Sequence, residues 1–271
     1  MMRDITFGQY YPSDSVIHRL DPRTKILSSL IFIVAMFVCK SYYSYLICFA
    51  FLVFCIIISK IPLSSILKTV KAIIFIIVIT VLINVFFYEE GKVLASWWVF
   101  TITEQGLIFA SKMAMRLIFL VIGTSLITLT TTPMNLTDGL ESLFKPLKRI
   151  GFPVHDVAII MSIALRFIPT LMEEIDKIMM AQKARGASFD SGGLIKRAKA
   201  LIPILIPLFV STFRRADELA LALDSRCYNA TPNRTKMKKL TINKNDVISM
   251  LFTLVFLGGI IVLRVLLPNL L

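Results

Sequence analysis

The chain has 271 residues, of which 56% are hydrophobic and only 17% are charged, and its mean hydropathy is +0.78. This composition excludes an ordinary soluble domain and predicts an integral membrane protein. The formal net charge of +13 requires no nucleic-acid partner, because apposition to the anionic headgroups of a lipid bilayer and to acidic protein surfaces accounts for it, and no nucleic-acid motif is present.

Five charge-free runs are predicted to cross the membrane as helices, since about 20 apolar residues span the hydrocarbon. They cover residues 26–39, 41–59, 72–88, 117–137 and 247–263. The first run is short, but Lys25 and Lys40 flank it and can extend their ammonium groups to the two interfaces. The predicted fold class is an all-α integral membrane protein with about five transmembrane helices and a cytoplasmic set of amphipathic helices. No cleavable signal peptide is expected, because the first 25 residues are polar.

The distribution of lysine and arginine predicts a multi-pass protein with a cytoplasmic N-terminus. Basic residues precede the first span and separate the second span from the third: Arg3, Arg19, Arg23, Lys25, Lys60, Lys68 and Lys71. The segment between the third and fourth spans instead contains Glu89, Glu90, Glu104, Lys92, Trp97 and Trp98. By the positive-inside rule this segment is external, and its tryptophans suit the interfacial belt.

Between the fourth and fifth spans lies a segment with 18 basic and 10 acidic residues, which is predicted to be cytoplasmic. It lacks low-complexity sequence and alternates apolar stretches with charge, so it is expected to be folded. The predicted organisation is an N-terminal membrane domain of four spans, this cytoplasmic region and a C-terminal transmembrane helix, over residues 1–132, 133–245 and 246–271.

The cytoplasmic region is predicted to begin with a short amphipathic helix. Asn135 or Thr137 is its candidate N-terminal cap, and Gly151 and Pro153 end it.

A second helix is predicted over about 154–183, with Gly186 as its C-terminal stop. One stripe of this helix is apolar at four-residue spacing, and most charges lie off the stripe. The stripe consists of Ile159, Ile163, Phe167 and Leu171. It has two interpretations at this stage: core between helices, or a contact surface for a partner.

A third helix is predicted over about 193–225. Pro203 and Pro207 lie within its apolar run 201–213 and predict a kink or a break. The run is short for a span, so entry into the membrane and packing on other helices both stay open.

No metal site and no disulfide framework are expected. Cys39, Cys48 and Cys55 lie in or beside the first two spans, where packing is their expected role, and Cys227 lies on the cytoplasmic side. His18 and His155 are isolated, and no pair of cysteine or histidine residues has the spacing of metal ligands.

A local pattern recurs at the ends of the second and third cytoplasmic helices, in "IDKIMMAQKAR" and "ADELALALDSR". Identical residues lie 41 positions apart in the pairs Asp176 and Asp217, Ala181 and Ala222, and Arg185 and Arg226. Each arginine precedes a predicted break, at Gly186 or near Asn229 and Pro232, so its guanidinium is presented past a helix end. There it can bind a carboxylate through two hydrogen bonds. The alternative is a cation that only complements the helix dipole. The presence of two copies favours docking onto two similar partner surfaces.

The chain shows no energy source of its own. It lacks a Gly-rich loop that ends in Gly-Lys-Ser or Gly-Lys-Thr, so it is predicted neither to bind nor to hydrolyse ATP. The five predicted spans contain no aspartate or glutamate, which argues against transport driven by protons or sodium ions. A membrane protein with two cytoplasmic docking points and no energy source suggests that energy comes from partners.

The sequence resembles the transmembrane T component of energy-coupling factor (ECF) transporters, of the CbiQ type. The resemblance covers nearly the whole chain and rests on "IHRLDPRTKIL", on "LTTTPMNLTDGLESLFKPLKRIGFPVHDVAIIMSIALRFIPTLMEEIDKIMMAQKARGASFD" and on "RRADELALALDSRCY". It implies an energy-coupling subunit of a bacterial importer for vitamins or metal ions, in which two ABC-type ATPases carry ATP and Mg while a small membrane-embedded S component binds the substrate.

The resemblance also implies roles for particular residues. The ATPase-docking motifs are Ala184, Arg185 and Gly186 in the first copy and Ser225, Arg226 and Cys227 in the second. The second copy departs from Ala-Arg-Gly at both flanks, which leaves the backbone at Cys227 less free than a glycine. The candidate platform for the S component comprises Ile159, Ile163, Phe167 and Leu171 with Leu201 and Leu205 of the apolar run.

Two other classes of protein are alternatives to this interpretation. The nearer is a permease subunit of an ordinary ABC importer, which would form the substrate path itself. An intramembrane enzyme would need clustered acids or metal ligands in the bilayer; the nearest sequence is "EEIDK", whose acids have no histidine within reach along the sequence.

Overall fold

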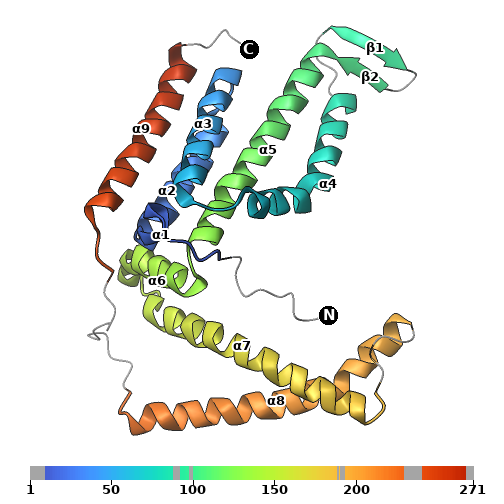
Figure 1. Cartoon of the computed structure of the whole chain (residues 1–271), viewed down its shortest axis with the longest axis vertical. Coiled ribbons are helices and arrows are strands. Elements are labelled where there is room, and N and C mark those ends of the chain that lie inside the picture. The colour runs from blue at the N-terminus through green and yellow to red at the C-terminus, as the bar shows by residue number, and fades with distance from the viewer. Residues whose placement is uncertain are drawn as a thin grey trace. The chain divides into compact units, whose positions relative to one another are not determined.

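The computed structural model describes residues 10–87, 92–97, 100–187, 189, 193–228 and 240–266 (Figure 1). The chain divides into two compact units. The first unit comprises Met1–Leu143 with Leu240–Leu271, and the second unit is Phe144–Lys239.

The first unit is a helical bundle with one small hairpin. Its elements are α1 (Val16–Arg19), α2 (Pro22–Val38), α3 (Tyr42–Ser59), α4 (Leu63–Phe87), β1 (Val93–Trp97), β2 (Phe100–Thr103), α5 (Glu104–Thr130), α6 (Pro133–Phe144, of which Phe144 begins the second unit) and α9 (Lys244–Leu266). The antiparallel strands β1 and β2 had no counterpart in the predicted elements. Of the residues predicted in the external segment, Glu89, Glu90 and Trp98 lie outside the described residues.

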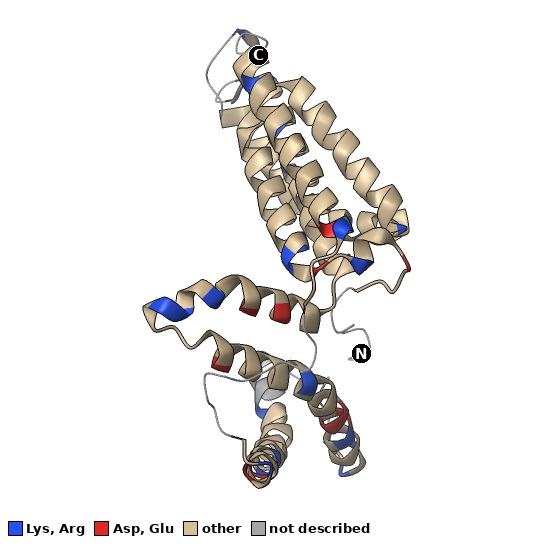
Figure 2. Ribbon diagram, turned by 90° about the vertical axis from the view of Figure 1, so that its left-hand side faces the viewer, with Lys and Arg blue, Asp and Glu red and all other residues tan. Residues whose placement is uncertain are grey.

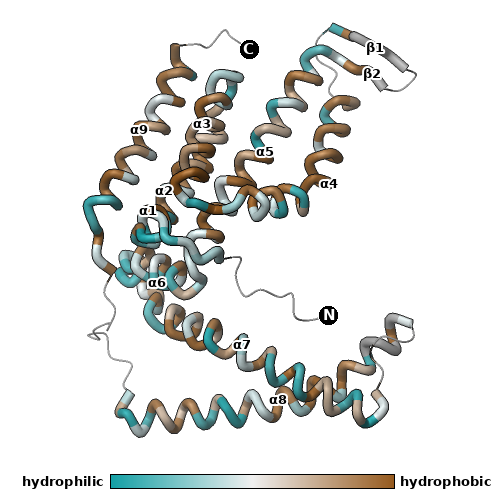
Figure 3. Tube along the Cα trace, in the orientation of Figure 1, coloured by the Kyte–Doolittle hydropathy of each residue, from teal (hydrophilic) through white to brown (hydrophobic). Residues whose placement is uncertain are grey.

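Five described helices are long and apolar enough to cross a membrane, which confirms the predicted class of all-α multi-pass membrane protein. They are α3, α4, α5, α9 and, in the second unit, α7 (Val154–Ala184). Figure 3 shows α3, α4 and α9 as mostly hydrophobic, and Figure 2 shows few charged residues along the middle of the bundle helices.

One of these five helices differs from the five predicted spans. The predicted first span corresponds to α2, whose 17 residues extend only about 25 Å, less than the hydrocarbon thickness of about 30 Å. In its place stands α7, which belongs to the segment 133–245 that is predicted to be cytoplasmic from its excess of basic residues. Its first 18 residues carry only Asp156 and Arg166, so length and composition also allow a span.

The predicted bounds of the fourth span, 117–137, were wrong at both ends. The helix α5 begins at Glu104, where the Thr103 hydroxyl accepts a hydrogen bond from the Gly106 amide. It ends at Thr130, and the next helix has its own cap: the Thr132 hydroxyl accepts from the Asn135 amide. The cap of α6 is therefore Thr132, in place of Asn135 or Thr137, and Pro133 occupies the first helical position, where its missing N–H costs nothing.

The core of the first unit lies among α2, α3 and α9. Aromatic side chains stack across it, with the ring centroids of Phe51 and Phe256 separated by 4.1 Å. The buried members of the cluster are Phe32, Ala35, Met36, Cys39, Tyr45, Cys48, Leu52, Phe256 and Ile260. Cys39 and Cys48 thus pack in the core, as predicted.

Buried polar contacts join the ends of the helices in the same unit. The Asp246 carboxylate, 1% exposed, accepts from the amides of Asp21 at 2.6 Å and Asn243 at 2.7 Å, and so ties the start of α9 to the start of α2. The Lys25 ammonium donates to the carbonyls of His18 at 3.1 Å and Thr130 at 2.9 Å, and ties α2 to the end of α5. These contacts give the "IHRLDPRTKIL" motif a structural role.

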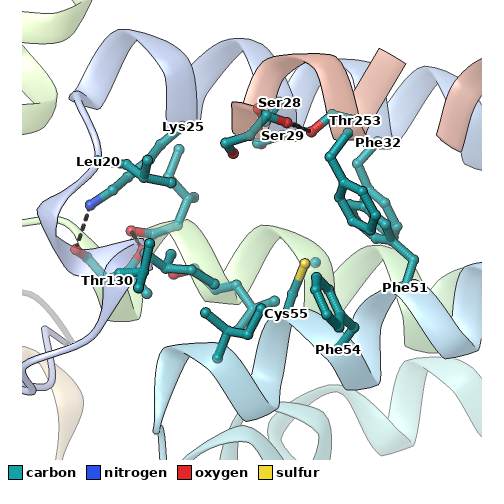
Figure 4. Close-up of a pocket in the computed structure, with 18 of the residues that line it drawn as sticks. Leu20, Lys25, Ser28, Ser29, Phe32, Phe51, Phe54, Cys55, Thr130 and Thr253 are labelled. Carbon is teal, nitrogen blue, oxygen red and sulfur yellow. Dashed lines mark hydrogen bonds between the residues drawn. The ribbon is translucent and has the colours of Figure 1, made fainter. Parts of the chain in front are cut away.

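A cavity of about 330 Å³ lies in the first unit among α1, α2, α3, α5 and α9 (Figure 4). Phe32, Phe51 and Phe54 lie on one side of it, and Lys25 lies at one end with its ammonium directed to the Thr130 carbonyl. None of the predicted site residues lines this cavity.

The second unit contains a 3₁₀ helix, η1 (Lys145–Ile150), followed by α7 and α8 (Leu194–Ser225). The predicted single amphipathic helix up to Gly151 is wrong, because α6 ends at Phe144 and η1 follows it; Gly151, with φ of 85°, ends η1. The helix α8 continues through Pro203 and Pro207, so the predicted break does not occur, and Figure 1 shows a bend along it. The second predicted helix, 154–183, agrees with α7.

Candidate functional site

The first arginine motif lies at the C-terminal end of α7. Arg185 is the last residue before the turn, and Gly186 adopts the left-handed conformation with φ of 89°. The Gly186 amide donates to the Lys183 carbonyl at 2.9 Å, and the Ala187 amide donates to the Gln182 carbonyl at 3.0 Å. These two bonds are a Schellman motif, so the carbonyls of Gln182 and Lys183 are satisfied by the backbone itself.

The second motif repeats this geometry at the end of α8. The Cys227 amide donates to the Asp224 carbonyl at 2.8 Å, and the Tyr228 amide donates to the Leu223 carbonyl at 2.9 Å. Each of these four residues lies 41 positions after its counterpart in α7. Cys227 has φ of 52°, a conformation that disfavours side chains with a Cβ. The cysteine in place of glycine therefore raises the conformational free energy of this turn, but the turn keeps the same two hydrogen bonds.

Both arginine side chains are exposed. Within the described part of the chain, neither guanidinium forms an ion pair with a carboxylate of this protein or a hydrogen bond to a helix carbonyl. Backbone amides already bond the carbonyls of Gln182 and Lys183 and those of Leu223 and Asp224, so neither arginine is needed as a cap for these carbonyls. The geometry leaves the donors of each guanidinium available to a carboxylate outside the chain.

The two helix ends point in opposite directions. The Gln182 side chain, near the end of α7, donates to the Pro203 carbonyl of α8 at 3.3 Å. Glu174, earlier in α7, contacts Arg215, later in α8, with 3.2 Å between the charged atoms. The helices are therefore antiparallel, and Figure 1 shows them crossing with their C-terminal ends on opposite sides. Arg185 and Arg226 thus lie at opposite ends of the helix pair.

The predicted platform residues differ in exposure between the two helices. On α7, Ile159, Ile163, Phe167 and Leu171 are half-buried. On α8, Leu201 is 48% exposed and Leu205 is 46% exposed, so they do not belong to the core of this chain. Their neighbours Ile202, Ile206, Phe209, Val210 and Phe213 are also exposed. The predicted apolar run, 201–213, includes all of these exposed residues.

We expect opposite effects from two substitutions at the helix ends. Gly186→Ala should destabilise its turn by about 1 kcal/mol, purely through the positive φ, because a Cβ there would meet no atom within 4 Å. Cys227→Gly should stabilise the other turn by about 0.5–1 kcal/mol. Hydrogen exchange of the amides at 186–187 and 227–228 measures both effects, with a change of about two- to fivefold. Cys227→Ala is the control, since it removes the sulfur and keeps the strain; equal exchange in the alanine and glycine variants would contradict the explanation.

Comparison with known proteins shows extensive similarity. Residues 13–237 match the family described as CbiQ, cobalt transport protein. "Energy-coupling factor transporter transmembrane protein EcfT" of Clostridium kluyveri is 52% identical over 256 residues, which cover 94% of this chain and 95% of that protein. The protein of the same name from Ruminiclostridium cellulolyticum is 49% identical over 264 residues, covering 97% and 98%. The one from Bacillus subtilis is 41% identical over 261 residues, covering 96% and 98%.

Proposed function

The chain belongs to the CbiQ family as an energy-coupling transmembrane subunit of ECF transporters, and on that premise we propose that its two arginine-bearing helix ends dock two ABC-type ATPases. The observation that carries the proposal is the identical Schellman geometry at Arg185 and Arg226, 41 residues apart on antiparallel helices. Each guanidinium binds a carboxylate of a different ATPase subunit, and the Ala184 and Ser225 side chains leave room for the approach.

The docked helix ends transmit the movement of the ATPases. ATP and Mg bind to the ATPases, and closure of the ATPase pair displaces the ends of α7 and α8. Each helix is continuous over more than 30 residues, about 45 Å of helical rise, so a displacement at its end is passed along the helix. A hydrogen bond to a charged group contributes roughly 1.5–3 kcal/mol, so two such docks can carry force while each remains reversible.

The exposed apolar face of α8 binds the small membrane-embedded S component. This face presents Leu201, Leu205 and Phe209, whose exposed fractions lie between 46% and 61%. An apolar surface of this kind is suited to a partner that is itself embedded in lipid. The half-buried stripe of α7 that includes Ile159 and Phe167 contributes the rest of this platform. The substrate, a vitamin or a metal ion, is bound by the S component.

This function requires the helix ends to lie in the cytoplasm, together with the N-terminus. Reporter fusions after Tyr88 are expected to be external, and fusions after Asn135 and after Gly186 cytoplasmic, because the lysine and arginine bias places them so. The fusion after Gly186 is the sharpest of the three, because a membrane-spanning α7 would carry Arg185 to the outside. An external signal there would contradict the docking proposal.

Reconstitution tests the function as a whole. The purified chain alone is expected to show no saturable ATP binding, since it lacks a phosphate-binding loop. With its two ATPases it is expected to form a complex that supports ATP-dependent uptake only when a third, small membrane protein is present. Uptake without that third protein would identify an ordinary ABC permease that forms its own substrate path.

A further inference from the structure

A polar cluster joins α7 to α8 at their crossing. The Glu174 carboxylate of α7 receives two hydrogen bonds from α8, one from the Ser211 hydroxyl and one from the Arg215 guanidinium, whose Nη2 lies 3.2 Å from Oε2. The side chains of Arg215 and Glu174 are 36% and 21% exposed, so the ion pair is partly shielded from water.

The ion pair joins positions that the internal repeat makes equivalent. Glu174 and Arg215 lie 41 residues apart, the same offset that relates Arg185 to Arg226. When two similar helices cross about a twofold axis, a residue on the axis meets its own counterpart. A faithful copy would place a second glutamate against Glu174 and repel it. Arginine at the equivalent position gives attraction in place of that repulsion.

The cluster lies at the same distance from both docking arginines. Arg185 follows Glu174 by 11 residues, and Arg226 follows Arg215 by 11 residues. Each helix therefore extends about 16 Å from the crossing to its arginine. With two equal arms, the separation of the two arginines depends on the angle between the helices at this point.

Besides the hydrogen bond from Gln182 to the Pro203 carbonyl, few fully buried side chains compete with the cluster for control of that angle. Among the described side chains of the second unit, only Val154, Ala158 and Ile204 are buried, and the first two lie at the far end of α7 from the crossing. Apolar contacts are non-directional, whereas a carboxylate held by a hydroxyl and a guanidinium fixes an orientation.

We propose that Glu174, Ser211 and Arg215 form a pivot that fixes the crossing of α7 and α8 and thereby sets the separation of Arg185 and Arg226. These are positioning residues that do not themselves touch the ATPases. The statement that the separation serves two ATPases rests on the proposed function; the statement that the cluster fixes the crossing stands without it.

The geometry of the crossing is tested in the full-length chain without partners, by measuring the distance between two spin labels with pulsed electron paramagnetic resonance. Nitroxide labels are placed at Met180 and Leu221, which are 63% and 70% exposed and are also related by the 41-residue offset. Cys227 is replaced by glycine, because it is the exposed cysteine among the described ones. The parent is expected to show one narrow distance distribution. Glu174→Arg and Arg215→Glu should each broaden it at least twofold, and the two changes together should restore it.

Matched controls lie one residue away on each helix. Glu173 and Arg214 have the same residue types and the same offset, and both are exposed. Glu173→Arg and Arg214→Glu should leave the distribution narrow. Unchanged width in Glu174→Arg and Arg215→Glu would overturn the pivot, and so would equal broadening in the controls.

Assembly with the ATPases tests whether the distance between Arg185 and Arg226 is needed to bind two ATPases at once. In Glu174→Arg and in Arg215→Glu, the fraction of chains that carry both ATPases should fall at least fivefold, with one ATPase retained, and the charge-swapped double variant should regain at least half. If the distance distribution broadens while the fraction of chains that carry both ATPases stays unchanged, the separation does not serve ATPase binding. If the docking proposal itself fails, the arginine-to-alanine variants will assemble normally, while the distance result is unaffected.

Discussion

Replacing Arg185 and Arg226 together by alanine is expected to lower assembly with the ATPases and ATP-dependent uptake by at least tenfold. Each single replacement should cause only a partial loss, roughly two- to fivefold. The reason is that a remaining dock keeps the second contact intramolecular and its effective concentration high. Without either dock, two contacts of roughly 1.5–3 kcal/mol each are lost together.

Lysine substitutions separate docking from a generic charge effect. Arg185→Lys and Arg226→Lys keep the charge and lose the planar pair of donors, so they should restore function only in part. If the arginines merely complement the helix dipoles, lysine will serve nearly as well and the double alanine variant will lose less than about 1 kcal/mol of stability. Full activity of the double alanine variant would remove the docking proposal. Complex yield and uptake are measured on the same preparations.

Placing charge on the exposed face of α8 is the second change with a large expected effect. Leu201→Glu with Leu205→Glu should reduce capture of the S component at least tenfold, because carboxylates would have to be buried without partners in an apolar contact. Binding of the ATPases should stay within about twofold of the parent, since Arg185 and Arg226 are untouched. Co-purification of the complex, with each subunit quantified, measures both.

An exposed apolar residue outside this face provides the control. Ile150 of η1 is 85% exposed, more than either leucine, and Ile150→Glu should leave capture of the S component unchanged. Equal losses in both variants would indicate a general effect of added negative charge. Normal capture by the double leucine variant would remove α8 as the platform.

Much of the membrane topology could be predicted from charge and hydropathy, and its failures have physical causes. The predicted fourth span begins at residue 117 because Arg116 interrupts the charge-free run there. In the structure the Arg116 guanidinium donates to the Cys39 carbonyl at 3.0 Å, so its charge has a partner and α5 continues past it to Glu104. A contact between residues far apart in sequence cannot be inferred from hydropathy. The end of α5 at Thr130, in contrast, could have been predicted, since "TTTPMN" contains a threonine cap followed by a proline, which indicates the start of the next helix.

The two helix ends show how far a repeat in one sequence can lead. The recurrence of Arg185 at Arg226 predicted two similar ends, and Gly186 predicted the first turn. Cys227 gave the opposite indication, because a residue with a Cβ usually avoids φ of 52°. The surrounding helix and its two terminal hydrogen bonds outweigh that local preference of about 1–2 kcal/mol.

The pairing of Glu174 with Arg215 could not be predicted from the repeat alone. Opposite charges at equivalent positions are visible in the sequence, but they meet only because α7 and α8 run antiparallel and cross there. Propensity and periodicity do not specify how two helices pack.

Photo-cross-linking from the two helix ends tests the central claim most directly. A benzophenone amino acid is placed at Lys183 or at Asp224, exposed positions in the last turns of α7 and α8, or at Val247 of α9, which is 60% exposed, as the control. In the assembled complex, Lys183 and Asp224 are each expected to give a covalent product with an ATPase, a different subunit in each case, and Val247 is expected to give none. Products of Lys183 and Asp224 that contain no ATPase would contradict the account.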